Sequence, residues 1–171
     1  MELTTSQQFP AEMMPVKAIR LTQGYVTIID PEDWPLVEPF HPWKVMISHE
    51  NVYAEFSMSG GALRLHALIT GYERTDHINL NALDNRRVNL RNASNSQNMA
   101  NGRLRINNKS GYKGVTWFKR DSCWRAQITV AGVCMHLGYY ADPVEAALAY
   151  DESAKFYFGE FAKTNVMLGL I

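Results

Sequence analysis

Four side chains of the types that hydrolyse phosphodiesters lie in one Asx-rich stretch of the chain. Asp76 and His77 are adjacent, and asparagines follow at Asn89 and Asn98. Carboxylate and amide oxygens bind hard divalent ions, and an imidazole of near-neutral pKa can take a proton from water. The intervening loop, 79–86, is rich in Asn and Asp, which bond nearby backbone and tolerate turn conformations. The sequence therefore predicts that the loop folds back and that the four side chains converge beside one metal ion.

This order and spacing resemble the HNH (ββα-metal) nucleases, most closely the homing endonucleases of phages and introns. The resemblance implies that Asp76 and Asn98 ligate one Mg²⁺ or Mn²⁺ ion. It also implies that His77 is the general base on the attacking water and that Asn89 hydrogen-bonds His77 to orient the ring. The same residues would also suit a solvated Asx-rich loop with an incidental histidine. The complete spacing, rather than any one pair, favours the nuclease.

The stretch that precedes this motif carries part of the same resemblance. L-R-L-H-A-L-I, which contains His66, resembles the strand that leads into the motif in these nucleases. The family usually has His-Arg at this place, where the chain has His66 followed by Ala67. The arginine, with any phosphate-binding role it carries in the family, is therefore missing here.

Composition excludes several classes of protein. A chain of 171 residues suits one ordinary domain or two small ones, and 46% hydrophobic residues exclude a disordered chain. No apolar run approaches the ~20 residues that span a bilayer, and the N-terminus lacks the features of a secretory signal. Cys123 and Cys134 form no C-x-x-C pair. We expect a cytoplasmic protein with no membrane partner, no structural zinc ribbon and no small-molecule cofactor.

Charge is distributed unevenly along the chain, although its formal net value is zero. The stretch 86–125 holds ten basic residues and one acid, whereas the first seventy residues hold four basic residues and eight acids. This uneven distribution predicts that the basic stretch 86–125 faces the phosphates of a nucleic acid. Within it, the segment 101–110 is basic and poor in core-forming residues. This segment could lie along a DNA backbone, with Arg103, Arg105 and Lys109 in contact with phosphates. It could also be a flexible tether between two domains, and the two roles are compatible.

Three short alternating segments and one helical segment follow Gly111. Trp124, Ala126, Ile128 and Val130 point to one face of the predicted sheet, and Arg125, Gln127 and Thr129 point to the other with His136. Asp142 and Pro143 open a helix, and small alanines along it allow close approach to the apolar face. The second face is then left open. It carries cations and amides.

This segment resembles the plant Apetala/ethylene-response-factor DNA-binding domain. The matching pieces are Y-K-G-V from Tyr112, W-R-A-Q-I from Trp124, H-L-G-Y-Y from His136, E-A-A-L-A-Y-D from Glu145 and F-G-E-F-A from Phe158. The plant domains are richer in Arg and Trp at several contact positions, and His136 could also be an exposed strand residue with no base contact. The residues that the resemblance places on the DNA-facing sheet are Lys113, Thr116, Arg120, Arg125, Gln127, Thr129 and His136.

The N-terminal part is predicted to be a small sheet with one helix. A hairpin is expected over 18–29 with its turn at Gln23-Gly24, followed by a helix that starts at Asp30. Strands are expected over 43–47, 52–58 and 62–69.

Together these patterns predict an α+β protein with a C-terminal three-stranded antiparallel sheet packed on one helix. We expect a loose arm (1–15), an HNH nuclease domain (16–100), a basic linker (101–110) and a DNA-binding domain (111–165). The expected partner is double-stranded DNA, contacted also by Arg86, Arg87 and Arg91, and the expected state is a monomer that nicks one strand. A non-cleaving sequence-specific DNA-binding regulator and an RNA-binding module are the alternatives.

Overall fold

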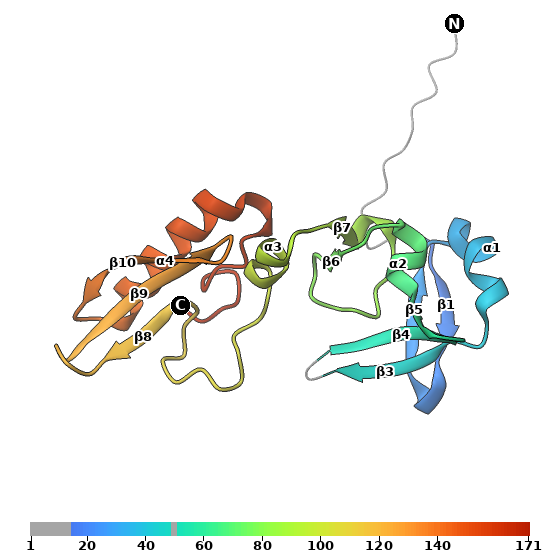
Figure 1. Ribbon diagram of the computed structural model, residues 1–171, viewed down its shortest axis with the longest axis horizontal. Helices are drawn as coiled ribbons and strands as arrows, with labels where there is room; N and C mark the ends of the chain where they lie inside the picture. Colours follow the sequence, from blue (N-terminus) through green and yellow to red (C-terminus); the bar gives the residue numbers. More distant parts are fainter. Residues whose placement is uncertain (1–14, 49–50) are drawn as a thin grey trace, which may run out of the picture. The chain divides into compact units, whose positions relative to one another are not determined.

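The computed structural model describes residues 15–48 and 51–171, and it has the predicted α+β class (Figure 1). The chain divides into two compact units, Met1–Asn92 and Ala93–Ile171. This division lies before residue 100, where the sequence placed the end of the nuclease domain, so helix α3 and the basic segment 101–110 belong to the second unit. Apart from Pro15, the predicted N-terminal arm lies outside the described residues.

The first unit begins with the expected hairpin. Strands β1 (Lys17–Arg20) and β2 (Val26–Ile29) are antiparallel, and the turn between them places Gln23 and Gly24 at positive φ. The segment from Pro31 to Phe40 then forms short helical turns, η3 (Pro31–Asp33), α1 (Trp34–Val37) and η4 (Glu38–Phe40). Prolines at the start of each turn suit these short helices, because a proline needs no N–H partner there.

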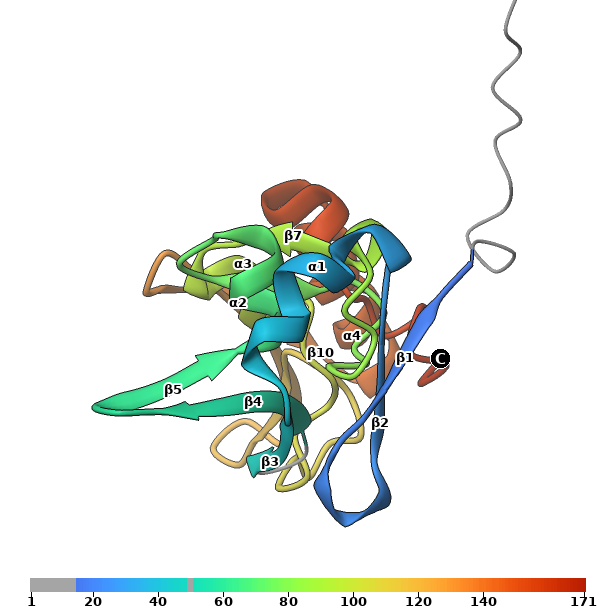
Figure 2. The same cartoon turned by 90° about the vertical axis from the view of Figure 1, so that its right-hand side faces the viewer.

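A three-stranded antiparallel sheet follows, in the order β3 (Lys44–Ser48), β4 (Asn51–Met58) and β5 (Gly61–Arg64). The predicted strand 62–69 is wrong in its second half, because Leu65–Thr70 forms helix α2. The helix ends at Gly71, whose φ of 67° is left-handed, and its N–H reaches the Ala67 carbonyl. Figure 2 shows α2 beside α1 and next to β4 and β5.

The motif stretch forms a second hairpin, β6 (Thr75–His77) paired antiparallel with β7 (Leu90–Asn92), with the 3-10 turn η5 (Arg87–Asn89) before β7. Helix α2 packs on both strands. The core of the unit lies between these elements, where Ile29, Val37, Trp43 and Leu65 are almost completely buried. Burial of such side chains contributes roughly 1.5–3 kcal/mol each, so this core holds the motif hairpin in place.

The second unit begins with α3 (Asn95–Ala100), whose start is a capping box formed by Ser94 and Gln97. Its sheet has the order β10 (Val133–Tyr140), β9 (Cys123–Val130) and β8 (Val115–Phe118), and the long helix α4 (Pro143–Phe158) packs on all three strands. The turn η6 (Gly159–Phe161) follows. Asp142 caps α4 as expected, since its carboxylate accepts from the Val144 N–H at 2.8 Å.

The two faces of this sheet divide as the alternation predicts. Ala126, Ile128, Ala146 and Ala147 are buried where the sheet meets α4, and the small alanines permit that close packing. Strand register pairs Thr116 with Arg125 and Gln127 with His136, on the face away from α4. A register shift between His136 and Gly138 then places Tyr139 opposite Arg125, so the aromatic ring joins the same face. Among the described residues, no helix is both long enough and apolar enough to cross a membrane.

Candidate functional site

The β6–β7 hairpin positions the acid and histidine of the motif. Asp76 lies opposite Arg91 and His77 opposite Leu90, and the Ile78 N–H donates to the Asn89 carbonyl at 3.0 Å. Asp76 and His77 are both buried, with 3% and 7% of their surfaces exposed. A carboxylate and an imidazole rarely occupy buried neighbouring positions unless they are paired or hydrogen-bonded, so the partners of both side chains matter.

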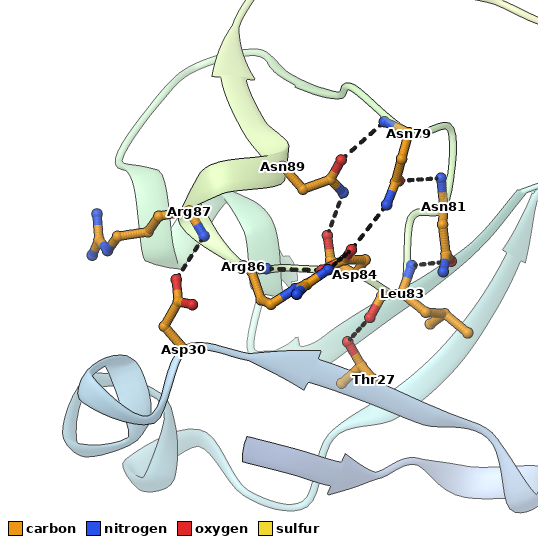
Figure 3. Close-up of polar contacts among 9 residues, drawn as sticks. All are labelled: Thr27, Asp30, Asn79, Asn81, Leu83, Asp84, Arg86, Arg87 and Asn89. Carbon is orange, nitrogen blue, oxygen red and sulfur yellow. Dashed lines mark hydrogen bonds and ion pairs between the residues drawn. The ribbon is translucent and has the colours of Figure 1, made fainter. Parts of the chain in front are cut away.

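The Asx loop folds back onto the hairpin by side-chain hydrogen bonds (Figure 3). The Asn79 N–H donates to Asn89 Oδ1 at 2.9 Å, Asn89 Nδ2 donates to the Asp84 carbonyl at 2.7 Å, and Asn79 Nδ2 donates to Asp84 Oδ2 at 2.9 Å. The loop is also hydrogen-bonded to strand β2, where the Ile28 N–H donates to the Leu83 carbonyl at 2.9 Å. These Asn and Asp side chains therefore act as the loop's internal framework, as Asx residues do in tight turns.

Asn85, to which the sequence analysis assigned no role, holds the His77 ring. It is completely buried, and its Oδ1 lies 3.2 Å from His77 Nε2. Its Nδ2 donates to Thr27 Oγ1 at 2.8 Å and to the Ala82 carbonyl at 3.3 Å, and a carbonyl can only accept, so the amide orientation is defined. His77 Nε2 must then carry the proton, and Nδ1 is the nitrogen with the lone pair.

The resemblance gave this orienting role to Asn89. Asn89 is buried beside the hairpin, but its amide spans the loop from Asn79 to Asp84 and shapes the backbone instead. Nothing in the sequence distinguished Asn85 from the other amides of the loop. Only the contact with Thr27, fifty-eight residues earlier, shows its position.

A second histidine packs on the first. The rings of His66, on α2, and His77 are edge to face with centroids 5.2 Å apart, and the Tyr53 ring lies 5.8 Å from His66 and 6.5 Å from His77. Burial, and then the neighbouring His77 and Arg64 charges, lower the pKa of His66 to about 3. Burial also lowers the pKa of His77, against the opposing effects of Asn85, Asp76 and Asp84. Both imidazoles are therefore neutral at pH 7.

Acid should destabilise the first unit through His66. The unfolded chain protonates this residue near pH 6.5, whereas the folded chain resists protonation down to about pH 3, so stability falls over that window as the pH falls. The loss should approach about 1 kcal/mol per pH unit, somewhat below the full ~1.4 kcal/mol because His66 is not wholly buried. Hydrogen exchange of α2 and β6 at pH 7 and pH 5 measures it. His66→Phe should reduce the slope to the part that the lowered pKa of His77 contributes, and the exposed His41→Phe should leave it unchanged. Equal slopes in all three proteins would contradict the assignment.

Asp76 is the acid next to His77, and its Oδ2 accepts from Arg91 Nε at 2.8 Å. The other nearby acid, Asp84, is occupied by Arg86 and Asn79, which donate to both of its oxygens. Burial alone would raise the pKa of Asp84, but the hydrogen bonds and charge of Arg86 lower it overall. Asp84 is thus ionised and committed to the loop. Asp76 has the donor type that a hard divalent ion prefers, but one of its oxygens is paired with Arg91.

No group of three or more His, Cys, Asp or Glu side chains in the described part of the chain is arranged to hold a metal. The predicted ligand Asn98 lies on α3 in the second unit, whereas Asp76, His77 and Asn89 lie in the first. Three of the four predicted residues therefore lie in the first unit. The pairing of Asp76 with Asn98 stays a prediction.

Three arginines predicted to contact DNA are ion-paired within the first unit. Arg86 and Arg91 are nearly buried against Asp84 and Asp76, at 2.7 and 2.8 Å. Arg87 donates to Asp33 at 2.7 Å but keeps 56% of its side chain exposed. The charge count over 86–125 missed this neutralisation because the acids concerned lie outside that window. Arg86 and Arg91 stabilise the loop and the hairpin, and of the three only Arg87 keeps a largely exposed side chain.

In the second unit, the open sheet face combines cations, amides and rings. Thr116, Thr129 and His136 are exposed, and Arg125 and Gln127 are partly exposed between them. The Arg120 and Arg125 guanidinium groups lie 5.1 and 5.6 Å from the Phe118 ring centroid, and the tilted rings of His136 and Tyr139 have centroids 4.4 Å apart. Arg120 also bonds Asp121 at 2.8 Å, in an exposed pair. Six of the seven residues that the resemblance assigned to the DNA-facing sheet are thus available at the surface.

The seventh, Lys113, has a different place. It is 9% exposed, and its Nζ donates to the carbonyls of Ala100, Gly102 and Lys163 at 2.8, 2.8 and 2.6 Å. Burial lowers the pKa of Lys113 to about 8, which still leaves it charged at pH 7 with three protons for three acceptors. The prediction of a DNA contact for Lys113 is wrong, because all of its donors are used inside the unit. Arg103, Arg105 and Lys109, in contrast, are exposed.

Comparisons of the chain with protein-family models, with curated proteins and with solved structures find no match.

Proposed function

We propose that this protein is a metal-dependent DNA endonuclease that hydrolyses phosphodiester bonds. The observation that carries the proposal is the buried Asp76–His77 pair, in which Asn85 holds the neutral imidazole with Nε2 protonated. A neutral imidazole held in one orientation and one tautomer is suited to act as a general base in hydrolysis.

His77 Nδ1 accepts a proton from the attacking water in this mechanism. The resulting hydroxide attacks phosphorus in line with the 3′ oxygen, and the P–O3′ bond breaks. The leaving oxygen takes a proton from solvent, so the products are a 5′-phosphate and a 3′-hydroxyl. Asn85 contributes by holding the ring and its tautomer, and the His66 and Tyr53 rings limit the motion of the imidazole.

Asp76 would hold the divalent ion, Mg²⁺ or Mn²⁺, with Asn98 as the predicted second ligand. The donor chemistry fits, because Mg²⁺ is commonly bound by one or two carboxylate or carbonyl oxygens and keeps several waters. When bound, the ion supplies positive charge to the pentacovalent phosphate and to the departing oxygen. Arg91 Nε donates to Asp76 Oδ2 at 2.8 Å and so orients the carboxylate.

The second unit would bind the duplex DNA that the first unit cuts. The sheet face with Arg120, Arg125, Gln127 and His136 offers cations for phosphates and hydrogen-bonding groups for base edges. The major groove is wide enough to accept strands. As a monomer, the protein would cut one strand in each binding event.

The direct test is nicking of supercoiled plasmid by the complete protein. We expect conversion to open circles with Mg²⁺ or Mn²⁺ and none with EDTA. Cleavage that persists in EDTA would contradict a metal-dependent mechanism.

A non-cleaving DNA-binding regulator is the second candidate. It is favoured by one observation, the 2.8 Å ion pair that already neutralises Asp76 through Arg91. This candidate predicts tight binding of the duplex with no cutting in any divalent ion.

A further inference from the structure

The segment before the C-terminal sheet presents one conspicuous apolar side chain. Ile106 keeps 90% of its surface exposed, the largest fraction of any large hydrophobic residue in the described part of the chain. Its sequence neighbours Arg105 and Asn107 are exposed as well, so Ile106 stands on a polar surface rather than within an apolar patch. Isolated exposed hydrophobics are common, and the surroundings of this one decide what it can do.

The turn that carries Ile106 is fixed at both ends. The Asn108 N–H donates to the Arg105 carbonyl at 2.9 Å, which closes the turn beneath Ile106. Asn108 Nδ2 donates to the Tyr112 carbonyl at 3.0 Å, and Asn108 Oδ1 accepts from the Gly111 N–H at 2.7 Å. At the start of the segment, the buried Lys113 ammonium holds the Gly102 carbonyl at 2.8 Å. A turn anchored in this way loses little conformational entropy when it binds a partner.

Cations flank the turn on both sides. Arg103, Arg105 and Lys109 are exposed, and the stretch 101–110 contains no acid and an exposed amide, Asn107, directly after Ile106. Proteins that bind the DNA minor groove use Arg, Lys and Asn to follow it and insert an apolar wedge, Ile among them, between base pairs. A protein partner would instead call for a continuous apolar surface around the anchor.

We infer that the 103–109 turn enters the minor groove of duplex DNA and that Ile106 wedges between two base pairs and bends the duplex. The inference rests on the proposed DNA-binding function and adds a contact mode that the sheet face does not supply. Arg103, Arg105 and Lys109 hold the flanking phosphates while Ile106 covers the unstacked base. The free-energy cost of unstacking the two base pairs is offset by contacts with the additional protein surface that a bent duplex can reach.

End-to-end energy transfer on a labelled duplex tests the wedge. The probe is a short duplex selected from a random pool by binding to the wild-type protein in EDTA, which prevents cutting. Wild type should raise the transfer efficiency, and Ile106→Ala should lose at least about half of that change while it still binds. Ile106→Met keeps a wedge and should bend as wild type does. Phe156→Ala removes another strongly exposed hydrophobic side chain, on α4, and serves as the matched control.

Bending by Ile106→Ala equal to that of wild type would overturn the inference and leave the proposed function standing. So would a wild-type complex that binds without bending. Absence of any duplex binding by wild type would overturn the proposed function together with the inference. A 2-aminopurine placed at successive steps should brighten at one step with wild type and not with Ile106→Ala.

Discussion

Replacement of His77 by alanine should lower the rate of plasmid nicking by roughly 10²–10⁴, the usual contribution of a general base. The expectation follows from the site, because Asn85 holds the neutral His77 ring in one tautomer on the hairpin. DNA affinity should be unchanged, since the ring is buried in the first unit and the proposed DNA contacts lie mainly in the second. Single-turnover nicking and a separate binding assay in EDTA measure the two effects.

His41→Ala is the matched control for this experiment, because His41 is exposed and lies outside the hairpin. It should nick as fast as wild type. A His77→Ala protein that nicks at the wild-type rate would show that another group is the base.

Replacement of Lys113 by methionine should destabilise the second unit by about 2 kcal/mol, because each of two part-buried carbonyls loses its donor at a cost near the lower end of ~1–3 kcal/mol. The carbonyls of Gly102 and Lys163 lose the Lys113 ammonium, whereas that of Ala100 retains the Lys163 N–H at 3.2 Å. Methionine keeps the apolar stem of the side chain, so the change removes the charge and hydrogen bonds with little loss of packing. Hydrogen exchange of β9 and α4 measures the free energy of opening in this unit alone.

Lys109→Met provides the contrast. Lys109 is exposed, so its removal should leave stability unchanged, weaken DNA binding and reduce the salt dependence by about one phosphate contact. If Lys113→Met instead kept full stability and lost DNA affinity, the ammonium would be a DNA contact after all.

The elements of this protein were predictable where side-chain alternation is strong. The hairpin over 18–29, the strands β9 and β10 and the helix opened by Asp142 and Pro143 follow from local rules of turns, pleat and caps. Helix α2 was missed because Leu65–Thr70 is a short apolar run, which periodicity alone cannot distinguish from a buried strand. The left-handed cap at Gly71 was the available signal.

The site was less predictable because its contacts join distant parts of the chain. The spacing of the motif identified Asp76 and His77 as candidate site residues. Asn85, which holds the His77 ring, is identified only by its bonds to Thr27 and Ala82 in the fold. Charge counting along the sequence likewise treated Arg91 and Lys113 as phosphate ligands. Their partners, Asp76 for one and three backbone carbonyls for the other, become neighbours only in the fold.

The chemistry of the cut ends tests the central claim most directly. Plasmid nicked by the wild-type protein in Mg²⁺ or Mn²⁺ should carry a 5′-phosphate and a 3′-hydroxyl, so DNA ligase should reseal it to closed circles. Nicks that ligase cannot reseal, or intact plasmid in both ions with the duplex firmly bound, would contradict water attack assisted by His77 with departure of the 3′ oxygen.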